Sequence, residues 1–307
     1  MKINIGCTSD NNYSQHLAVM LESLFYNNKK HKIKVYIFTN DIDKTNQEKI
    51  LKVSEKHNQK IVFLGVKIPK EINKIRIPEK HISINAYYKV LIPESLPEKI
   101  SKILILDCDL IVLKDISKLY NTKLEEKIIG AVPNPLSEDR CKILGISPKD
   151  GYFNSGVMIV NTKKWKSQKI AKKVIEYAIS HNDIIANAEQ DPLNFILKNK
   201  WKKIEYVYNQ QTIMYAYNYR RLKIKKKEYL EAIKKPVIIH YTSSNKPWLL
   251  SGNHPQRRLY FQYLRMTPYK NYKYKDFTLK SIVQHYLNPK IEYCIVDTLK
   301  AIRSLRF

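Results

Sequence analysis

The chain has 307 residues, of which 44% are hydrophobic and 11% aromatic, so it can bury a substantial core and is not disordered throughout. No apolar run approaches the roughly 18–20 residues of a membrane-spanning helix, and the N-terminus turns polar too soon for a signal peptide. The four cysteines are scattered, which argues against a zinc site or a disulfide framework and fits a reducing compartment.

The formal charge of +27 raises the alternative of a basic nucleic-acid-binding or scaffold protein. The basic residues are spread along the whole chain, however, and there is no helix-turn-helix, zinc-finger or RNA-binding-sheet signature. We therefore expect no nucleic acid as a partner. The charge supports affinity for another anion: nucleotide phosphates, an acidic glycolipid or an anionic membrane surface.

The first third of the chain alternates apolar runs, which predict strands, with amphipathic runs, which predict helices. The expected strands are 3–7, 34–40 and 60–66, and the expected helices are 16–27 and 45–58. After a helical stretch at 86–91, KILILD at 102–107 predicts a further strand. Because these apolar runs do not alternate, we expect a mostly parallel sheet that is covered by helices on both faces.

This pattern predicts an α/β, Rossmann-like architecture that handles a nucleotide. The loop after the first strand holds no G-x-G-x-x-G, however, and no P-loop motif occurs in a chain with only seven glycines. Dinucleotide binding and P-loop chemistry are therefore both disfavoured.

The middle of the chain predicts strands at 128–132 and 152–161 and a helix at 170–180. EQDPLNFIL opens another helix, with Asp191 as a natural N-cap and Pro192 at the first helical position. A late strand at 235–241 contains His240.

The composition changes after Gly252. Residues 254–307 hold eleven Lys and Arg against three Asp and Glu, with seven Tyr. In the last 18 residues, Ile291, Ile295 and Leu299 share one helical face with Ile302, which predicts a basic amphipathic helix. Such a helix either lies on an anionic membrane surface or packs on the body of the protein or on a partner.

Two carboxylates interrupt the apolar stretch KILILDCDLIV, residues 102–112. In an extended chain Asp107 and Asp109 would point the same way, and their repulsion requires a shared proton or a cation. A shared proton would suit acid–base chemistry, whereas a hard divalent ion would suit work on phosphate oxygens. Their place at the carboxyl end of a predicted strand favours the ion, because ligands of open α/β sheets bind there. The alternative is that Asp107 caps a turn and Asp109 is solvated.

His240 also ends an apolar strand, where a histidine serves either as a core residue or as a metal ligand. As a third ligand beside two carboxylates it would favour Mn²⁺ over Mg²⁺. Lys246 follows closely and could neutralise phosphate.

Five stretches in this order carry a resemblance to a known family: HISINAYYKVLIP, KILILDCDLIVLKDISKLY, YFNSGVMIVNTKKW, EQDPLN and HYTSSNKPW. Together they resemble glycosyltransferase family 8, the retaining sugar-nucleotide transferases with a GT-A fold. They look closest to the bacterial lipooligosaccharide galactosyl- and glucosyltransferases. The resemblance runs from the first strand to about Trp248, which implies a catalytic domain at 1–252 and a separate basic region at 253–307.

The resemblance implies a role for each matching residue. Asp107, Asp109 and His240 would bind Mn²⁺, or Mg²⁺, at the diphosphate of UDP-galactose or UDP-glucose. The other positions implied to contact the UDP-sugar are Thr8, Asp10, Asn12, Tyr13, Lys89, Cys108, Asn154, Ser243 and Lys246, with Tyr13 in the place of a base-stacking aromatic. Glu189, Gln190 and Asp191 would line the point of cleavage, although Asp191 is alternatively only the helix cap.

Four positions depart from the family pattern. Lys89 replaces an arginine, Glu189 replaces an aspartate and Ser243 replaces a glycine. Asn134 aligns with a position that is often acidic. Since the three predicted metal ligands are all present, these changes bear on sugar choice more than on activity.

The implied reaction retains the anomeric configuration. Gln190 occupies the position where a double displacement needs a carboxylate, so we expect front-face attack instead. The acceptor would be a saccharide or glycolipid of the cell surface, and the basic tail would hold the enzyme, as a cytoplasmic peripheral protein, at the inner face of the membrane. A UDP-sugar hydrolase is the alternative.

Overall fold

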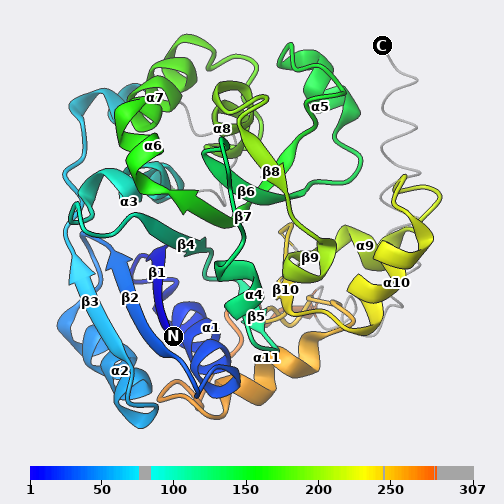
Figure 1. Ribbon diagram of the computed structural model, residues 1–307. Helices are drawn as coiled ribbons and strands as arrows, with labels where there is room; N and C mark the ends of the chain where they lie inside the picture. The colour runs from blue at the N-terminus through cyan, green and yellow to red at the C-terminus, as the bar shows by residue number, and fades with distance from the viewer. Residues whose placement is uncertain (76–83, 245, 280, 282–307) are drawn as a thin grey trace.

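The computed structural model describes residues 1–75, 84–244, 246–279 and 281, and a seven-stranded sheet runs through its centre (Figure 1). The strand order is β3-β2-β1-β4-β7-β6-β8. The bounds are β1 Lys2–Thr8, β2 Lys32–Phe38, β3 Lys60–Leu64, β4 Lys102–Leu106, β6 Ile129–Pro133, β7 Phe153–Asn161 and β8 Trp201–Lys203. Strand β7 is antiparallel to both of its neighbours, and every other adjacent pair is parallel. The predicted mostly parallel sheet is therefore confirmed.

Helices cover both faces of this sheet, as Figure 1 shows. Helices α1 (Ser14–Asn27) and α2 (Lys44–Lys56) lie on one face, and α3 (Tyr88–Ser95), α6 (Thr162–Ser167) and α7 (Ile170–Ser180) lie on the other. Strand β4 explains why the apolar runs do not alternate. Its Leu104 and Leu106 are buried in the core cluster beneath α1, whereas Ile103 and Ile105 are buried in the cluster beneath α3 and α7.

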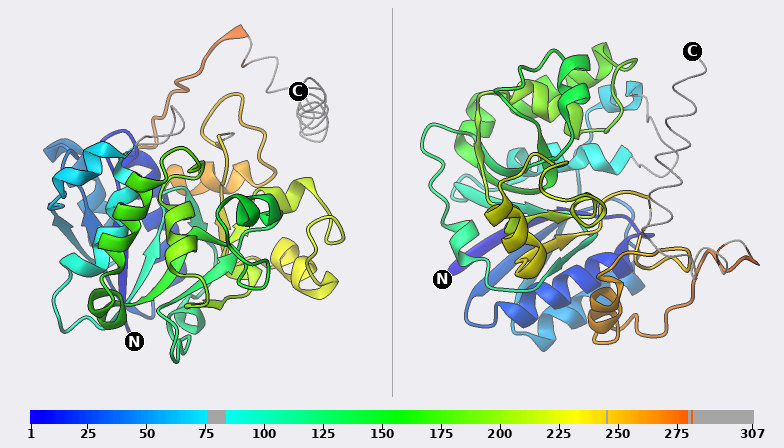
Figure 2. Two further views of the ribbon diagram at one scale, coloured as in Figure 1. Left: turned by 90° about the horizontal axis from the view of Figure 1, so that it is seen from above. Right: turned by 90° about the vertical axis from the view of Figure 1, so that its right-hand side faces the viewer.

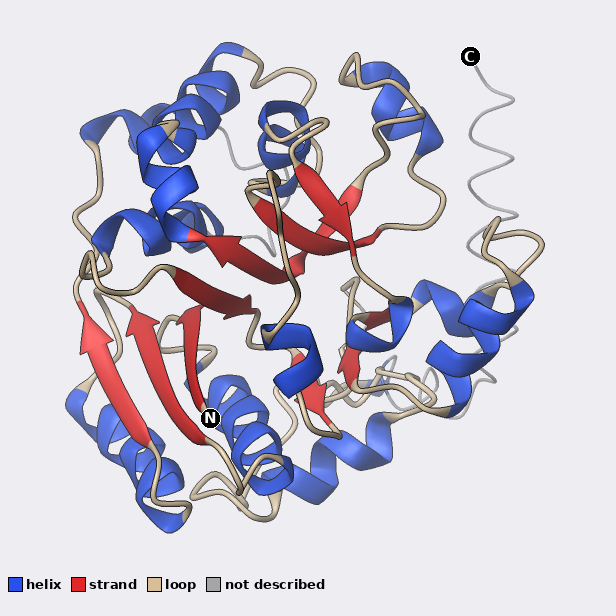
Figure 3. Cartoon of the chain, in the orientation of Figure 1, coloured by secondary structure: helices blue, strands red, loops and turns tan. Residues whose placement is uncertain are grey.

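A second sheet of three short strands lies beside the carboxyl end of β4 (Figure 3). Its order is β5 (Leu110–Val112), β10 (Ile238–His240) and β9 (Gln210–Gln211). KILILDCDLIV is therefore divided between two strands, and Asp107 follows the carboxyl end of the first of them, as the sequence predicts. The chain leaves the large sheet after Leu106 and joins the small one at Leu110, so Asp107 and Asp109 lie at the junction of two sheets.

Most predicted elements are present, with ends that shift by a few residues, and α7 has the predicted bounds. The prediction that Asp191 is an N-cap is wrong, because α8 (Gln190–Ile196) begins two residues before Pro192 and Asp191 lies in its first turn. The Asp191 carboxylate still binds backbone amides, those of Ala186 and Asn187 in the preceding loop.

The remaining helices are short or polar. Their bounds are α4 Ser117–Tyr120, α5 Glu138–Ile143, α9 Ile213–Ala216, α10 Lys226–Lys234 and α11 Arg257–Leu264, with 3₁₀ helices at Lys70–Lys74, Ile84–Tyr87 and Tyr206–Tyr208. None of the helices in the described part of the chain is long and apolar enough to cross a membrane.

Residues beyond Gly252 pack on the body in part. Helix α11 lies beside α1 (Figures 1 and 2), where Tyr260 and Tyr263 are buried in a cluster with Val19 and Trp248. The amphipathic helix predicted in the last 18 residues lies outside the described residues, and the division of the chain at residue 252 stays a prediction.

Candidate active site

A cavity of about 420 Å³ opens where β1, β4 and β10 end. It brings together thirteen of the predicted site residues: Thr8, Asp10, Tyr13, Lys89, Asp107, Cys108, Asp109, Asn154, Glu189, Gln190, His240, Ser243 and Lys246. Two predicted residues do not line it. Asn12 is exposed on the surface, and Asp191 is fully buried within the protein.

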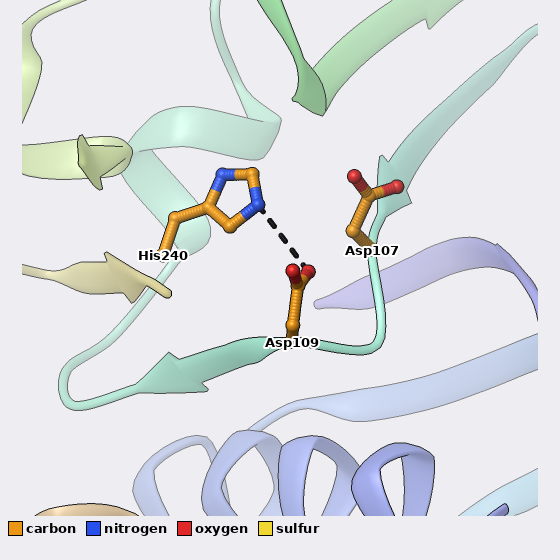
Figure 4. Close-up of side chains that lie close together, drawn as sticks. All are labelled: Asp107, Asp109 and His240. Carbon is orange, nitrogen blue, oxygen red and sulfur yellow. Dashed lines mark ion pairs between the residues drawn. The ribbon is translucent and has the colours of Figure 1, made fainter. Parts of the chain in front are cut away.

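Asp107, Asp109 and His240 converge from three elements (Figure 4). Asp107 follows β4, Asp109 precedes β5 and His240 ends β10, and one ligand atom of each lies within 4.8 Å of the others. His240 Nε2 lies 3.3 Å from Asp109 Oδ1. Two carboxylates and one imidazole are a ligand set that fits Mn²⁺ or Mg²⁺, so the residues present are compatible with the predicted cation.

The backbone of β7 makes room for the His240 ring. A Cβ atom on Gly156 would overlap the imidazole at Cε1, so the close approach of ring and strand requires glycine. The carbonyl of Gly156 also accepts a hydrogen bond from the Asp107 amide at 3.0 Å. One residue thus fixes the positions of two of the three predicted ligands.

Lys89 connects the carboxylate cluster to the other side of the cavity. Its Nζ lies 2.6 Å from Asp107 Oδ1 and 2.8 Å from Glu189 Oε1, and the lysine is only 4% exposed. Burial alone would lower the pKa of Lys89, but Asp107 and Glu189 outweigh it and raise the pKa above its ordinary value. Lys89 is therefore a cation held between two carboxylates.

Lys246 makes the corresponding contact with Asp109. Its Nζ lies 2.6 Å from Asp109 Oδ2 and donates to the carbonyl of Tyr241 at 2.7 Å. Burial would raise the pKa of Asp109, but the attraction of Lys246 and His240 holds it below its ordinary value. The Asp109 carboxylate is accordingly ionised and able to act as a metal ligand.

The side-chain amide of Gln190 is held at both ends. Its Oε1 accepts from the backbone amide of Ser155 at 3.0 Å, and its Nε2 donates to the Tyr152 hydroxyl at 3.1 Å. The Tyr152 hydroxyl donates in turn to Asp191. The amide is thus presented to the cavity in one fixed orientation.

Asp191 is fully engaged beneath Gln190. Besides Tyr152 it binds Arg140, with Nη2 at 2.6 Å from Oδ2, and the two loop amides already described. Burial would raise the pKa of Asp191, but the bonds from Arg140 and Tyr152 hold it below its ordinary value. Its carboxylate supports Gln190 and does not face the cavity.

The loop that follows β1 supplies another part of the cavity wall. Asp10 Oδ1 accepts from the Tyr13 amide at 2.8 Å, which orders the turn after β1. The Tyr13 ring packs edge-on against Trp248, with centroids 6.1 Å apart. The Cys108 thiol lies 3.0 Å from the carbonyl of Thr8, and burial raises the pKa of the Cys108 thiol well above its ordinary value, so it stays neutral.

Two residues of the cavity wall have positive φ angles although they are not glycines. Ser243 has φ = 80° and Ala188 has φ = 39°. Non-glycine residues rarely adopt this region, and such strain concentrates at functional sites. At Ser243 it occurs where the family pattern has glycine.

The sequence did not single out several further lining residues: Ser9, Asn85, Ala86, Ser155, Asn187, Ala188 and Thr242. Most are small or neutral and carry no chemical signature of their own. Adjacency is a signal for four of them, because Ser9, Ser155, Ala188 and Thr242 each directly precede or follow a predicted site residue.

Comparison with known proteins agrees with this geometry. A model of glycosyl transferase family 8 matches residues 4–251. The chain is 32% identical over 270 residues to general stress protein A of Bacillus subtilis, covering 86% of this chain and 94% of that protein. It is 26% identical over 288 residues to the lipopolysaccharide 1,2-glucosyltransferase of Escherichia coli, covering 92% and 82%.

Among solved structures, the galactosyltransferase LgtC in complex with donor and acceptor sugar analogues matches with a TM-score of 0.79. The identity is 22%, and the match covers 87% of this chain and 96% of that one, so it establishes a shared GT-A fold. This chain belongs to glycosyl transferase family 8 and is a glycosyltransferase.

Proposed function

We propose that this enzyme transfers galactose or glucose from a UDP-sugar to a saccharide or glycolipid acceptor in the synthesis of lipopolysaccharide or another cell-surface glycan. One observation carries the proposal: a single cavity holds the Asp107, Asp109 and His240 cluster together with Glu189 and Gln190. The names of the E. coli glucosyltransferase and of the LgtC galactosyltransferase support a hexose without choosing between the two.

Asp107, Asp109 and His240 would hold Mn²⁺, with Mg²⁺ as the alternative. When bound there, the cation would supply Lewis-acid stabilisation of the diphosphate as UDP leaves. Lys246 adds a positive charge on the same side, because its ammonium already lies against Asp109. Its role is to stabilise the negative charge that develops on the leaving group.

We propose front-face attack with retention of configuration. Glu189 is a poor nucleophile because Lys89 and the Ser155 hydroxyl both bind its Oε1, and Asp191 does not line the cavity. The acceptor hydroxyl attacks on the face that UDP leaves, and its proton passes to the departing phosphate oxygen. Gln190 presents its fixed amide dipole to the positive charge that develops on the sugar ring.

The nucleotide would lie along the first loop, where Thr8, Asp10 and Tyr13 line the cavity. Tyr13 offers a half-buried ring for stacking on the base. The implied contact by Asn12 requires a different arrangement of this loop, since its side chain lies on the surface.

The excess of positive charge supports a cytoplasmic enzyme that works as a peripheral protein at the inner face of the membrane. Residues 254–307 carry eleven Lys and Arg against three Asp and Glu, and a basic amphipathic segment binds anionic lipid.

The deciding experiment measures UDP release from a panel of UDP-sugars in the presence of Mn²⁺, Mg²⁺ or EDTA, with and without saccharide acceptors. We expect UDP-galactose or UDP-glucose to be turned over with Mn²⁺ and not with EDTA, and Asp107→Ala to abolish turnover. Analysis of the products then separates transfer from hydrolysis. Turnover by Asp107→Ala at the wild-type rate would refute the cation assignment.

A further inference from the structure

We infer that Asn209 is a positioning residue that fixes both the His240 imidazole and the Asn154 amide for the reaction; this inference rests on the proposed function. Asn209 is completely buried in the turn between the 3₁₀ helix Tyr206–Tyr208 and β9. Its Oδ1 lies 3.0 Å from His240 Nδ1, and its Nδ2 lies 2.8 Å from Asn154 Oδ1.

A backbone amide determines the direction of every bond in this chain of groups. The Gly156 N–H can only donate, and it donates to Asn154 Oδ1 at 3.0 Å, so that atom is an acceptor. The atom of Asn209 that faces Asn154 Oδ1 must therefore be its NH₂ group. The remaining atom, the carbonyl oxygen of Asn209, then faces His240.

The orientation of Asn209 selects one tautomer of His240. An amide oxygen carries no proton, so the hydrogen bond requires that His240 Nδ1 be protonated. Nε2 then keeps its lone pair, and it is the atom that lies 3.3 Å from Asp109 Oδ1 in the carboxylate cluster. Asn209 thus makes Nε2 the ligand atom, which is how outer hydrogen-bond partners tune histidine ligands.

The ring is also restrained from its other side. Gly156 packs against His240 Cε1 so closely that no Cβ would fit between them. The imidazole therefore lies between the β7 backbone and the Asn209 side chain, and rotation of the ring would break the bond to Asn209.

The second consequence concerns the sugar side of the cavity. Asn154 Oδ1 is occupied by Gly156 and Asn209, so Asn154 presents its Nδ2 group as a donor to a ligand in the cavity. One buried amide thereby couples the orientation of a predicted metal ligand to that of a predicted sugar contact.

Two substitutions separate these roles. Asn209→Ala removes both hydrogen bonds. We expect it to weaken Mn²⁺ binding in the presence of UDP by 10- to 100-fold, the usual loss when an outer partner of a histidine ligand is removed. Asn209→Asp keeps an acceptor for His240 Nδ1 but sets a carboxylate oxygen against Asn154 Oδ1. We expect it to bind Mn²⁺ at least as tightly as wild type while the KM for the UDP-sugar rises.

Free Mn²⁺ is measured by electron paramagnetic resonance during titration of the protein with UDP present, and KM by UDP release. Asn28→Ala is the matched control, because Asn28 is also completely buried and bridges α1 to Ile116 away from the cavity. It should lower the melting temperature without changing Mn²⁺ affinity. Melting in EDTA reports whether each variant folds.

If folded Asn209→Ala binds Mn²⁺ as tightly as wild type, or if Asn209→Asp loses Mn²⁺ binding, the inference is wrong. The Asn209→Asp result decides the matter alone should the alanine variant not fold. Failure of the wild-type protein to bind Mn²⁺ with UDP would instead refute the proposed function.

Discussion

Gly156 is the position where one added methyl group would most directly disturb the site. Gly156→Ala places a Cβ atom within the His240 ring and forces the imidazole away from Asp109. We expect at least a tenfold loss of Mn²⁺ affinity, of the size seen when the support of a histidine ligand is lost, measured by calorimetry with UDP present. Gly65→Ala is the matched control, since the nearest atom to its new Cβ is Asn40 Oδ1 at 3.7 Å. Equal Mn²⁺ affinities for the two variants would contradict the claim that Gly156 is needed to make room for the His240 ring.

The Tyr152 hydroxyl joins the Asp191 carboxylate to the side-chain amide of Gln190. Tyr152→Phe should lower kcat for UDP release by roughly 10- to 100-fold, the size of effect that follows from a small misplacement of a group at the site. The KM for the UDP-sugar should change little, because Tyr152 does not line the cavity.

Tyr152→Phe should also destabilise the fold, so a control variant with a similar loss of stability is required. Losing a buried hydrogen bond costs about 1–3 kcal/mol, and Tyr120→Phe incurs a comparable loss, because the Tyr120 hydroxyl bonds to Asn4 and to the carbonyl of Lys102 far from Gln190. A fall in kcat that is equal in both variants would mean that Tyr152 acts only through stability.

At the scale of elements, Asp191 joins α8 to α5 through Arg140. Its pKa in the folded protein is depressed, so this group stabilises the fold above the pKa of the unfolded chain and loses that effect as pH falls through the folded value. The free energy of unfolding should therefore decrease below about pH 4, the ordinary range of aspartate. Asp191→Asn should remove part of this acid dependence.

The same substitution leaves Arg140 without its carboxylate partner, so we expect a loss of about 3–5 kcal/mol at neutral pH. Denaturant unfolding between pH 3 and 7 measures both effects. Asp139→Asn, on the exposed face of α5, is the control and should change neither. An unaltered acid slope in Asp191→Asn would contradict the assignment.

The elements that could be predicted from sequence are those in which burial determines which positions carry apolar residues. Strand β4 and helix α7 are covered by the core, so their apolar residues recur at the spacing that the structure uses. Strands β8 and β9 have three and two residues, are polar, and exist because longer strands pair with them. Helix α10 is rich in lysine and fully buries only Ala232, while Tyr229 and Ile233 pack partly buried against the core, so its apolar pattern is short.

The candidate site could be predicted where a motif carries chemistry, and not where a neutral side chain orients another. Asp107, Asp109 and His240 follow from charge at strand ends. Asn209 and Ser155 act through hydrogen bonds to residues far away in the sequence. Likewise Asp191 looked like a helix cap, because its partner Arg140 lies 51 residues away.

At the scale of the whole molecule, the packing of α11 predicts where the chain can be shortened. Tyr260 is buried and bonds to His16 Nδ1 at 2.7 Å, and Asp276 accepts from the amides of Leu250 and Ser251. A chain that ends at Gly252 should therefore be destabilised, since removal of one buried aromatic side chain alone costs about 3–5 kcal/mol.

A chain that ends at Leu279 keeps α11 and every predicted site residue, so it should keep its binding of UDP with Mn²⁺. We expect the full chain to sediment with anionic vesicles and to be released by salt, whereas the shortened chain should not sediment with them. If the same fraction of the shortened chain and of the full chain sediments with the vesicles, the proposed role of the tail is wrong.

The change of sheet between Asp107 and Asp109 links ligand binding to local unfolding. Asp107 follows the large sheet, whereas Asp109 and His240 adjoin strands of the small one. A ligand held by all three residues would stabilise the association of the two sheets by an amount that grows with its concentration over its Kd. Amide hydrogen exchange should accordingly slow in β5, β9 and β10 when UDP and Mn²⁺ are added, and remain unchanged in β2 and β3, which bear none of the three residues. The three-stranded sheet would thus be the part of the enzyme whose rigidity depends on its substrate.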